Sequence, residues 1–333
     1  MNFIYLSFLV PHPLSLITPM WRDPVDYRKI KNLMNDANPK ESVRALLAEI
    51  VDYAGLFPPS QLSMAESVNN YAAYKNSNFN WMLGRFVVPV SRLDEFAESS
   101  KDWFSKTGDA WKLSVLASKD VYETVQWIEE FNGKFATNVI ADALEIKAAN
   151  ALEIENIAAH IPENLNAYFE LSLNENLTDS IVTLAVTKHR AKIRTGGITP
   201  EAFPSAEEIT RFMRICLAAN VPFKATAGLH HPLRCQKPLT YEKDAPKGLM
   251  NGFLNVFLAA GFIQQGFKPK LIQELLMDER EDNFLFTNDG VLWRQEYFIS
   301  TSQLKHLRSR GAISFGSCSF VEPIDDLKEI GIL

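Results

Sequence analysis

FKATAGLHHP, residues 223–232, reads as a buried strand that ends at Gly228 and continues into a loop with two adjacent histidines. Lys224 lies inside this otherwise apolar strand. Burying an ammonium group costs free energy unless the group is paired or used. A charged residue near the end of such a strand is typical of an enzyme site at the edge of a parallel sheet.

The same pattern, a short β-rich run followed by an amphipathic helical run, repeats along the chain from about residue 48. Strands that alternate with helices indicate crossover connections and a parallel sheet. Eight such units predict a (β/α)8 barrel. The rival, an open doubly wound sheet, lacks its GxGxxG marker after an early strand. The predicted strands are residues 51–57, 83–90, 111–117, 138–147, 167–173, 191–195, 222–227 and 313–316.

Two segments fall outside this repeat. Residues 1–47 are predicted as an N-terminal arm followed by a helical extension, and residues 48–333 as the barrel domain. An insertion over residues 268–310 precedes the last strand, with a hairpin around residues 288–290 and then a helix. The apolar run 249–262 predicts a helix that lies either in the core or at an interface.

The composition excludes several classes of protein. The 333 residues carry a formal net charge of -6, which disfavours nucleic-acid binding. The three cysteines, Cys216, Cys235 and Cys318, form no CxxC pair, so a disulfide framework is not expected and a cytoplasmic location is. No uninterrupted apolar run reaches the ~20 residues that span a membrane.

The apolar residues 1–20 leave three interpretations open. Three prolines interrupt this segment, and no basic residue precedes it as in a signal peptide. In the first interpretation the native protein starts at Met20. In the second the segment is an ordered arm on the barrel, and in the third it is a weak export signal.

Polar residues gather near the ends of the predicted strands, two positions apart and therefore on one face. The active sites of (β/α)8 barrels lie at these carboxyl ends. A structural layer of ion pairs inside the barrel is the alternative explanation for each residue taken singly. The residues concerned are Glu145 and Lys147, Glu170, Lys192 and Arg194, and Lys224 and Thr226, with Asp52 and Arg85 on the first two strands.

Lys224 and Lys192 are the candidate catalytic lysines. A lysine beside another cation loses its proton more readily and becomes a nucleophile toward carbonyl compounds. We therefore expect Lys224 to be the nucleophile or base, Lys192 to lower its pKa, and Glu145 or Glu170 to move protons. Residues 224–228 also resemble the strand-end lysine segment of deoxyribose-phosphate aldolases. Lys224 could equally hold a substrate anion without forming a bond to it.

Glycines at three strand ends predict an anion site. Backbone amides approach an anion closely at glycine, and barrels often bind phosphate after strands seven and eight. Arg194 would add a bidentate contact. Together, Lys192, Lys224 and Arg194 would form a basic cluster that favours an anionic ligand. Tight turns are the alternative explanation for the glycines. The predicted backbone contacts are at Gly196, Gly197, Gly228, Gly316 and Ser317, and Lys147 and Thr226 are further predicted anion-binding residues.

His230 and His231 are candidate acid–base groups or metal ligands. Both would serve one metal only if the loop bends after Gly228, with Glu145 or Glu170 as a further ligand. No HxH or HExxH spacing supports a metal, so no cofactor is required and a divalent metal stays an alternative.

Four strings in the sequence carry a resemblance to a known family. DYAGLFPP (52–59), KIRTGG (192–197), FKATAGLHHP (223–232) and FGSCSF (315–320) resemble those of a family of bacterial proteins to which no activity is assigned. The resemblance covers nearly all of the chain after about residue 40. It implies a soluble bacterial protein and supplies no mechanism.

Three functions remain open from the sequence. The first is a lyase- or isomerase-like barrel enzyme that acts on a small anionic carbonyl metabolite through a strand-end lysine. The second is a metal-dependent hydrolase that uses His230 or His231. The third is a barrel that binds a metabolite without catalysis. No nucleic acid or membrane partner is expected, and the sequence leaves open whether the protein forms a homo-oligomer.

Overall fold

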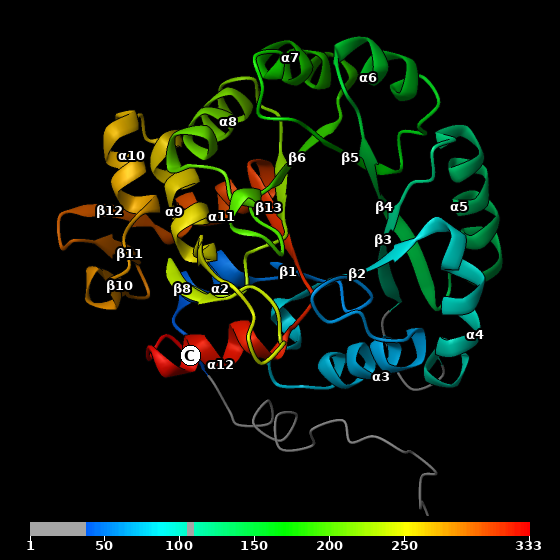
Figure 1. The fold of residues 1–333 in the computed structure, drawn as a ribbon, viewed down its shortest axis with the longest axis horizontal. Coiled ribbons are helices and arrows are strands. Elements are labelled where there is room, and N and C mark those ends of the chain that lie inside the picture. Colours follow the sequence, from blue (N-terminus) through cyan, green and yellow to red (C-terminus); the bar gives the residue numbers. More distant parts are fainter. Residues whose placement is uncertain (1–37, 105–109) are drawn as a thin grey trace, which may run out of the picture.

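Eight short parallel strands close into a barrel in the computed structural model, which describes residues 38–104 and 110–333 (Figure 1). The strand order around the barrel is β1-β13-β7-β6-β5-β4-β3-β2, so consecutive units are neighbours and the last strand closes on the first. The predicted (β/α)8 barrel is confirmed. Its strands are β1 (Val51–Tyr53), β2 (Leu83–Pro89), β3 (Trp111–Leu116), β4 (Val139–Lys147), β5 (Asn166–Glu170), β6 (Arg190–Arg194), β7 (Phe223–Thr226) and β13 (Ala312–Ser317).

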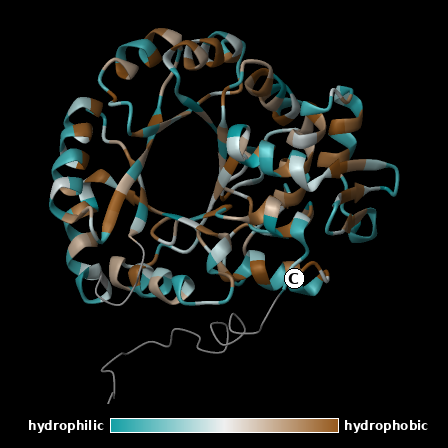
Figure 2. Cartoon of the chain, turned by 180° about the vertical axis from the view of Figure 1, so that it is seen from behind, coloured by the Kyte–Doolittle hydropathy of each residue, from teal (hydrophilic) through white to brown (hydrophobic). Residues whose placement is uncertain are grey.

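A ring of helices covers the outside of the barrel. Brown and teal segments alternate along this ring in Figure 2, as expected for helices that pack one apolar face on the strands. Capping boxes begin two of these helices, at Ser63 with Glu66 and at Ser205 with Glu208. The outer helices are α3 (Met64–Lys75), α4 (Leu93–Phe104), α5 (Val121–Phe135), α6 (Ala151–Ala158), α7 (Leu177–Thr187), α8 (Ala206–Ala218), α9 (Phe253–Gln264) and α12 (Val321–Glu329).

The insertion before β13 explains why α9 is apolar on every side. Residues 253–262 of α9 are all buried, because the insertion packs over the face that the barrel leaves uncovered. A Cβ on Gly261 would lie 2.3 Å from Ile299 Cδ1, so any larger residue there would force the Ile299 side chain to move. The apolar helix is therefore core. The insertion comprises α10 (Pro269–Leu276), the antiparallel strands β10 (Phe284–Phe286), β11 (Gly290–Trp293) and β12 (Tyr297–Ser300), and α11 (Thr301–Arg310).

The largest differences from the predicted boundaries are at the start of the apolar helix and at the end of the first strand. The helix predicted from residue 249 begins at Phe253, because Leu249 and Met250 belong to β9 (Lys247–Met250). This strand pairs with β8 (Cys235–Pro238) in a hairpin that the sequence did not reveal, since its apolar residues run directly into those of α9. The first strand ends at Tyr53, and the chain then turns with Phe57 N donating to Ala54 O.

One arginine of the insertion forms hydrogen bonds with the backbone at the amino-terminal end of the barrel. Arg308 of α11 donates to backbone carbonyls just before β1 and at the start of β13, and α11 packs against α2 (Glu41–Leu47). Its guanidinium donates to the carbonyl oxygens of Leu46, Ala48, Ala312 and Ile313. The helix that precedes the barrel is thereby tied to the last strand.

The predicted arm, residues 1–20, and the rest of the predicted extension up to residue 37 lie outside the described residues. Within residues 38–104 and 110–333, no helix combines the length and the apolar character needed to cross a membrane.

Candidate active site

A cavity of about 930 Å³ opens at the carboxyl ends of the barrel strands. Each of the eight strands contributes a residue to its wall, or the residue that follows the strand. The structure brings most of the predicted site residues into this wall: Glu145, Lys147, Glu170, Lys192, Arg194, Gly197, Thr226, Gly228 and His230. Six predicted residues do not line it: Asp52, Arg85, Lys224, Gly196, Ser317 and His231.

Lys192 lies in the cavity wall between two carboxylates. Its Nζ is 2.7 Å from Glu145 Oε2 and 2.8 Å from Glu170 Oε2, and 7% of its side chain is exposed. The register of β5 and β6 places Lys192 directly beside Glu170 on one interior face. Burial raises the pKa of Glu170, but the charge and hydrogen bond of Lys192, together with the charges of Arg194 and Lys147, outweigh it and leave the pKa below its usual value.

Lys224 lies deeper, beyond the cavity wall. Its Nζ is 2.5 Å from Asp52 Oδ2 and 2.7 Å from Glu145 Oε1, and only 1% of its side chain is exposed. The ammonium also lies 5.3 Å from the centre of the Tyr168 ring, within cation–π range.

The expectation that a neighbouring cation lowers the pKa of Lys224 is wrong. Burial alone would lower this pKa, but the negative charges of Asp52 and Glu145 outweigh it and raise the pKa above the usual value. The sequence places Lys192 beside Lys224 on the next strand, and the register confirms this. Glu145, however, lies between the two ammonium groups and binds both.

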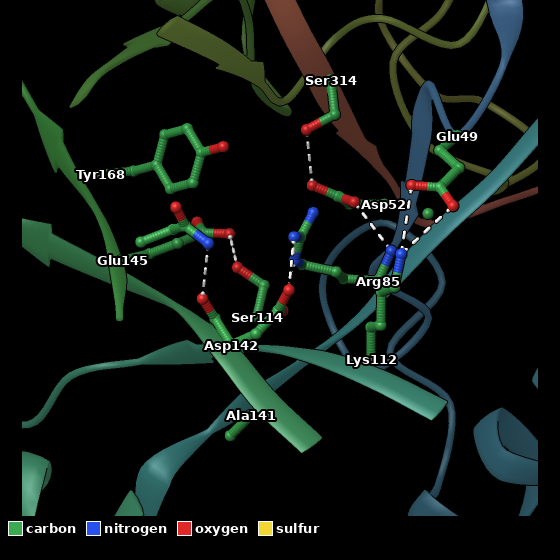
Figure 3. A network of polar contacts seen from close by, with 12 residues as sticks. Glu49, Asp52, Arg85, Lys112, Ser114, Ala141, Asp142, Glu145, Tyr168 and Ser314 are labelled. Atoms are coloured by element: carbon green, nitrogen blue, oxygen red, sulfur yellow. Dashed lines mark hydrogen bonds and ion pairs between the residues drawn. The ribbon is translucent and has the colours of Figure 1, made fainter. Parts of the chain in front are cut away.

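Further polar contacts hold the carboxylates of Asp52 and Glu145 in place (Figure 3). Asp52 accepts hydrogen bonds from Ser314 Oγ at 2.7 Å and from the backbone N–H of Arg85 at 2.8 Å. Ser114 Oγ donates to Glu145 Oε1 at 2.7 Å. The Arg85 guanidinium forms a two-point ion pair with Asp142, at 2.6 and 2.7 Å. Buried carboxylates with this many partners are held in a single geometry.

The charged residues therefore alternate in sign along one path, which we name the ion chain: Asp52, Lys224, Glu145, Lys192, Glu170 and Arg194. Three acids and three bases give a formal charge of zero. The predicted basic cluster is wrong for this reason, since a carboxylate separates each pair of successive cations. Burial raises the pKa of Glu145, yet the charges of Lys192 and Lys224 lower it well below its usual value, so it is ionised.

Comparison with known proteins adds no assignment. No protein-family model matches the chain, and no curated protein matches it. The site is therefore interpreted from its own chemistry.

Three exposed cations line the cavity, and we name them the rim cations: Arg194, which is the outer member of the ion chain, Lys147 and Lys119. The side chain of Arg194 is 49% exposed and reaches Glu170 only at 3.4 Å. Lys147 and Lys119 also line the cavity and are exposed, and neither forms an ion pair within the part of the chain that the structure describes. An anion that enters the cavity could therefore contact two lysines without an ion-pair partner and the exposed end of the ion chain at Arg194.

The glycines at the ends of β6 and β7 have a packing reason. Gly228 has a φ of +73°, in the left-handed region that side chains avoid. A Cβ there would lie 2.8 Å from Gly196 Cα, so the two loops touch backbone to backbone. This contact accounts for Gly196, which does not reach the cavity, whereas Gly197 and Gly228 line it.

The two histidines bind two different carboxylates of α12. His230 Nδ1 is 2.9 Å from Glu322 Oε2, and His231 Nδ1 is 2.5 Å from Asp326 Oδ2. Among the described residues, no group of three or more His, Cys, Asp or Glu side chains is arranged to hold a metal ion. The metal-dependent hydrolase stays a prediction.

Several site residues were missed by the sequence reasoning. Tyr168 has the same parity as Glu170, and Ser314 the same parity as Gly316, so alternation alone could have found them. Asp142 could not be found in this way, because the register between β3 and β4 shifts after Leu113. Nothing near Glu322 in the sequence indicates that it reaches the loop after β7.

Proposed function

We propose that this chain is a barrel enzyme of the lyase or isomerase class that acts on a small anionic carbonyl compound through Lys192. The observation that carries the proposal is the position of the Lys192 ammonium, in the cavity wall and within 2.8 Å of two carboxylates. An amine in that position can meet a carbonyl carbon, and the carboxylates beside it can exchange its protons.

The geometry favours Lys192 over Lys224 as the nucleophile. Lys192 lines the cavity, whereas Lys224 is enclosed and its charged form is stabilised by Asp52 and Glu145. A nucleophilic amine must be neutral and must touch the substrate. We therefore transfer the nucleophilic role to Lys192 and give Lys224 the role of a fixed cation that holds Glu145.

Glu170 is the proposed proton acceptor for Lys192. A ligand that fills the cavity displaces water, and loss of water weakens an ion pair relative to its neutral amine and acid form. Lys192 then passes one proton to Glu170, the amine nitrogen bonds to the carbonyl carbon, and the C=O π pair moves to the oxygen. The oxygen takes up the proton that the attacking nitrogen releases, which gives a neutral carbinolamine. Glu170 returns its proton to the resulting hydroxyl, the C–O bond breaks, and water leaves an iminium on Lys192.

The rim cations support an anionic substrate. Arg194 is half exposed beside the cavity, and a guanidinium matches a carboxylate or a phosphate in two contacts. Lys147 and Lys119 lie in the same wall. A carbonyl compound with one anionic group could be held at the rim while its carbonyl reaches Lys192.

The test is reductive trapping with sodium borohydride in the presence of pyruvate, acetaldehyde, dihydroxyacetone phosphate and glyceraldehyde 3-phosphate, followed by peptide mapping. We expect at least one compound to give an adduct at Lys192 that the Lys192→Met variant lacks. Lys147→Met is the matched control, because Lys147 also lines the cavity at a strand end, and it should retain the Lys192 adduct. The proposal is falsified if no compound labels Lys192 above the level found in urea-unfolded protein.

One observation favours a second candidate, a barrel that binds its ligand without catalysis. The ion chain is electrically balanced, so Lys192 needs no ligand to be stable where it lies. In that case a panel compound would protect the protein against thermal unfolding, yet no adduct and no turnover would appear.

A further inference from the structure

The structure offers a matched pair of histidines of which only one reaches the cavity. His230 and His231 are adjacent in the loop after β7, and each binds through Nδ1 to a carboxylate of α12. His230 lines the cavity, with 11% of its side chain exposed, whereas His231 does not line it. The same chemical unit therefore occurs once inside the site and once outside it.

Glu322 is held in place from two sides besides His230. Tyr241, in the loop between β8 and β9, donates its hydroxyl hydrogen to Glu322 Oε2 at 3.4 Å, and Glu322 N donates to Ser319 Oγ at 3.1 Å. Burial raises the pKa of Glu322, but the hydrogen bond from His230 and the other polar groups around the carboxylate together outweigh it and leave the pKa below its usual value. The carboxylate is therefore an anion at neutral pH.

An anionic acceptor at Nδ1 fixes the tautomer of a neutral imidazole. The Nδ1–H group donates to the carboxylate, so the lone pair that can accept a proton is on Nε2. Within the described chain, His230 forms no hydrogen bond through Nε2. His230 thus combines a held ring, a place in the cavity wall and a free basic nitrogen.

We propose that His230 moves a proton on and off the substrate carbon next to the carbonyl, and that Glu322 positions it. The inference rests on the proposed iminium at Lys192. His230 Nε2 takes a proton from that carbon, the C–H electron pair becomes a carbon–carbon double bond, and the C=N π pair moves to nitrogen. The products are a neutral enamine on Lys192 and a protonated His230, and the reverse step returns the proton.

The carboxylates of the ion chain are not available to move this proton at the substrate carbon. Glu145 binds two ammonium groups and Glu170 binds Lys192 and Arg194, so their oxygens are committed to holding cations and to forming the iminium. Imidazole accepts and donates protons at neutral pH, as a step that both removes and returns a proton requires. Both lyase and isomerase chemistry through an enamine need that step.

The test is deuterium exchange from D2O into the carbon next to the carbonyl of the panel compound that gives most borohydride adduct at Lys192. We expect His230→Gln to keep the adduct and to slow the exchange by about 100-fold or more. His231→Gln should keep both, since His231 has the same kind of partner but lies outside the cavity.

Glu322 is tested as a positioning residue by the same exchange and by the 15N signals of His230. Glu322→Ala should slow the exchange about 10-fold and decrease the fraction of His230 in the Nδ1–H tautomer. Glu322→Gln keeps an oxygen acceptor, so it should restore part of the exchange rate and part of the tautomer preference. Exchange at the wild-type rate in His230→Gln would overturn the inference and leave the proposed function intact. Absence of any Lys192 adduct would overturn the proposed function and this inference with it.

Discussion

The two halves of the ion chain use the same chemistry in different surroundings. In the enclosed half, Lys224 and Asp52 are each 1% exposed and joined at 2.5 Å. In the open half, Lys192 is joined to Glu170 at 2.8 Å and Arg194 is 49% exposed. The N–O distances of the two lysines are nearly equal, so they do not show which lysine stabilises the barrel and which can contact a ligand. Access to the cavity distinguishes the two lysines. Glu145 belongs to both halves, because it binds both of them.

Lys224→Met should have the largest effect on stability. The change keeps the volume of the side chain but leaves Asp52 and Glu145 as buried carboxylates without their shared cation. Breaking a buried pair in this way costs about 3–5 kcal/mol in the free energy of unfolding. Urea unfolding measures it.

Lys192→Met is the matched comparison for that experiment. Its partners reach the cavity and can be hydrated, so its cost should be about 1–3 kcal/mol. Equal losses in the two variants would remove the distinction between the enclosed and the open half.

Acid should weaken the fold through the shared carboxylate. The pKa of Glu145 is lowered in the folded protein, so Glu145 stabilises the fold at a pH above its unfolded pKa, about 4.3, and this contribution is lost as the pH falls below that value. The free energy of unfolding should therefore decrease from pH 5 toward pH 3. Glu145→Gln should show a shallower decrease than the wild type, and an unchanged slope would contradict the assignment.

Arg194→Ala should have the smallest effect on stability. An exposed ion pair contributes less than about 1 kcal/mol, so the free energy of unfolding should hardly change. The concentration of a phosphorylated panel compound that half-saturates trapping should rise about 10-fold, because one charge-assisted contact is lost. Arg310→Ala, an exposed arginine of α11 away from the cavity, is the control.

The barrel and much of its polar interior were predictable because both depend on local pattern. Alternation along each strand puts Glu145, Glu170, Lys192 and Lys224 on the interior face, and the structure agrees. A strand–helix repeat is legible in a single sequence because each unit buries its own apolar face.

The wrong prediction for the pKa of Lys224 and the site residues that the sequence did not reveal depend on contacts between residues that are distant in sequence. The pKa of Lys224 follows from Asp52, which lies 172 residues away and on the far side of the closure between β1 and β13. Asp142 points inward through a register shift that a period of two cannot anticipate. Glu322 reads as an ordinary acidic residue in the first turn of a terminal helix, and only the fold brings it to His230.

Arg308 sets a limit on how far the protein can be shortened. Its guanidinium donates to Leu46 and Ala48, just before the first strand, and to Ala312 at the start of the last strand. One arginine therefore connects these two parts of the barrel. A chain that began at residue 49 would leave this arginine with fewer acceptors and α11 without its neighbour α2. Domain boundaries for protein engineering should therefore be drawn before Glu41, although the barrel itself begins at Val51.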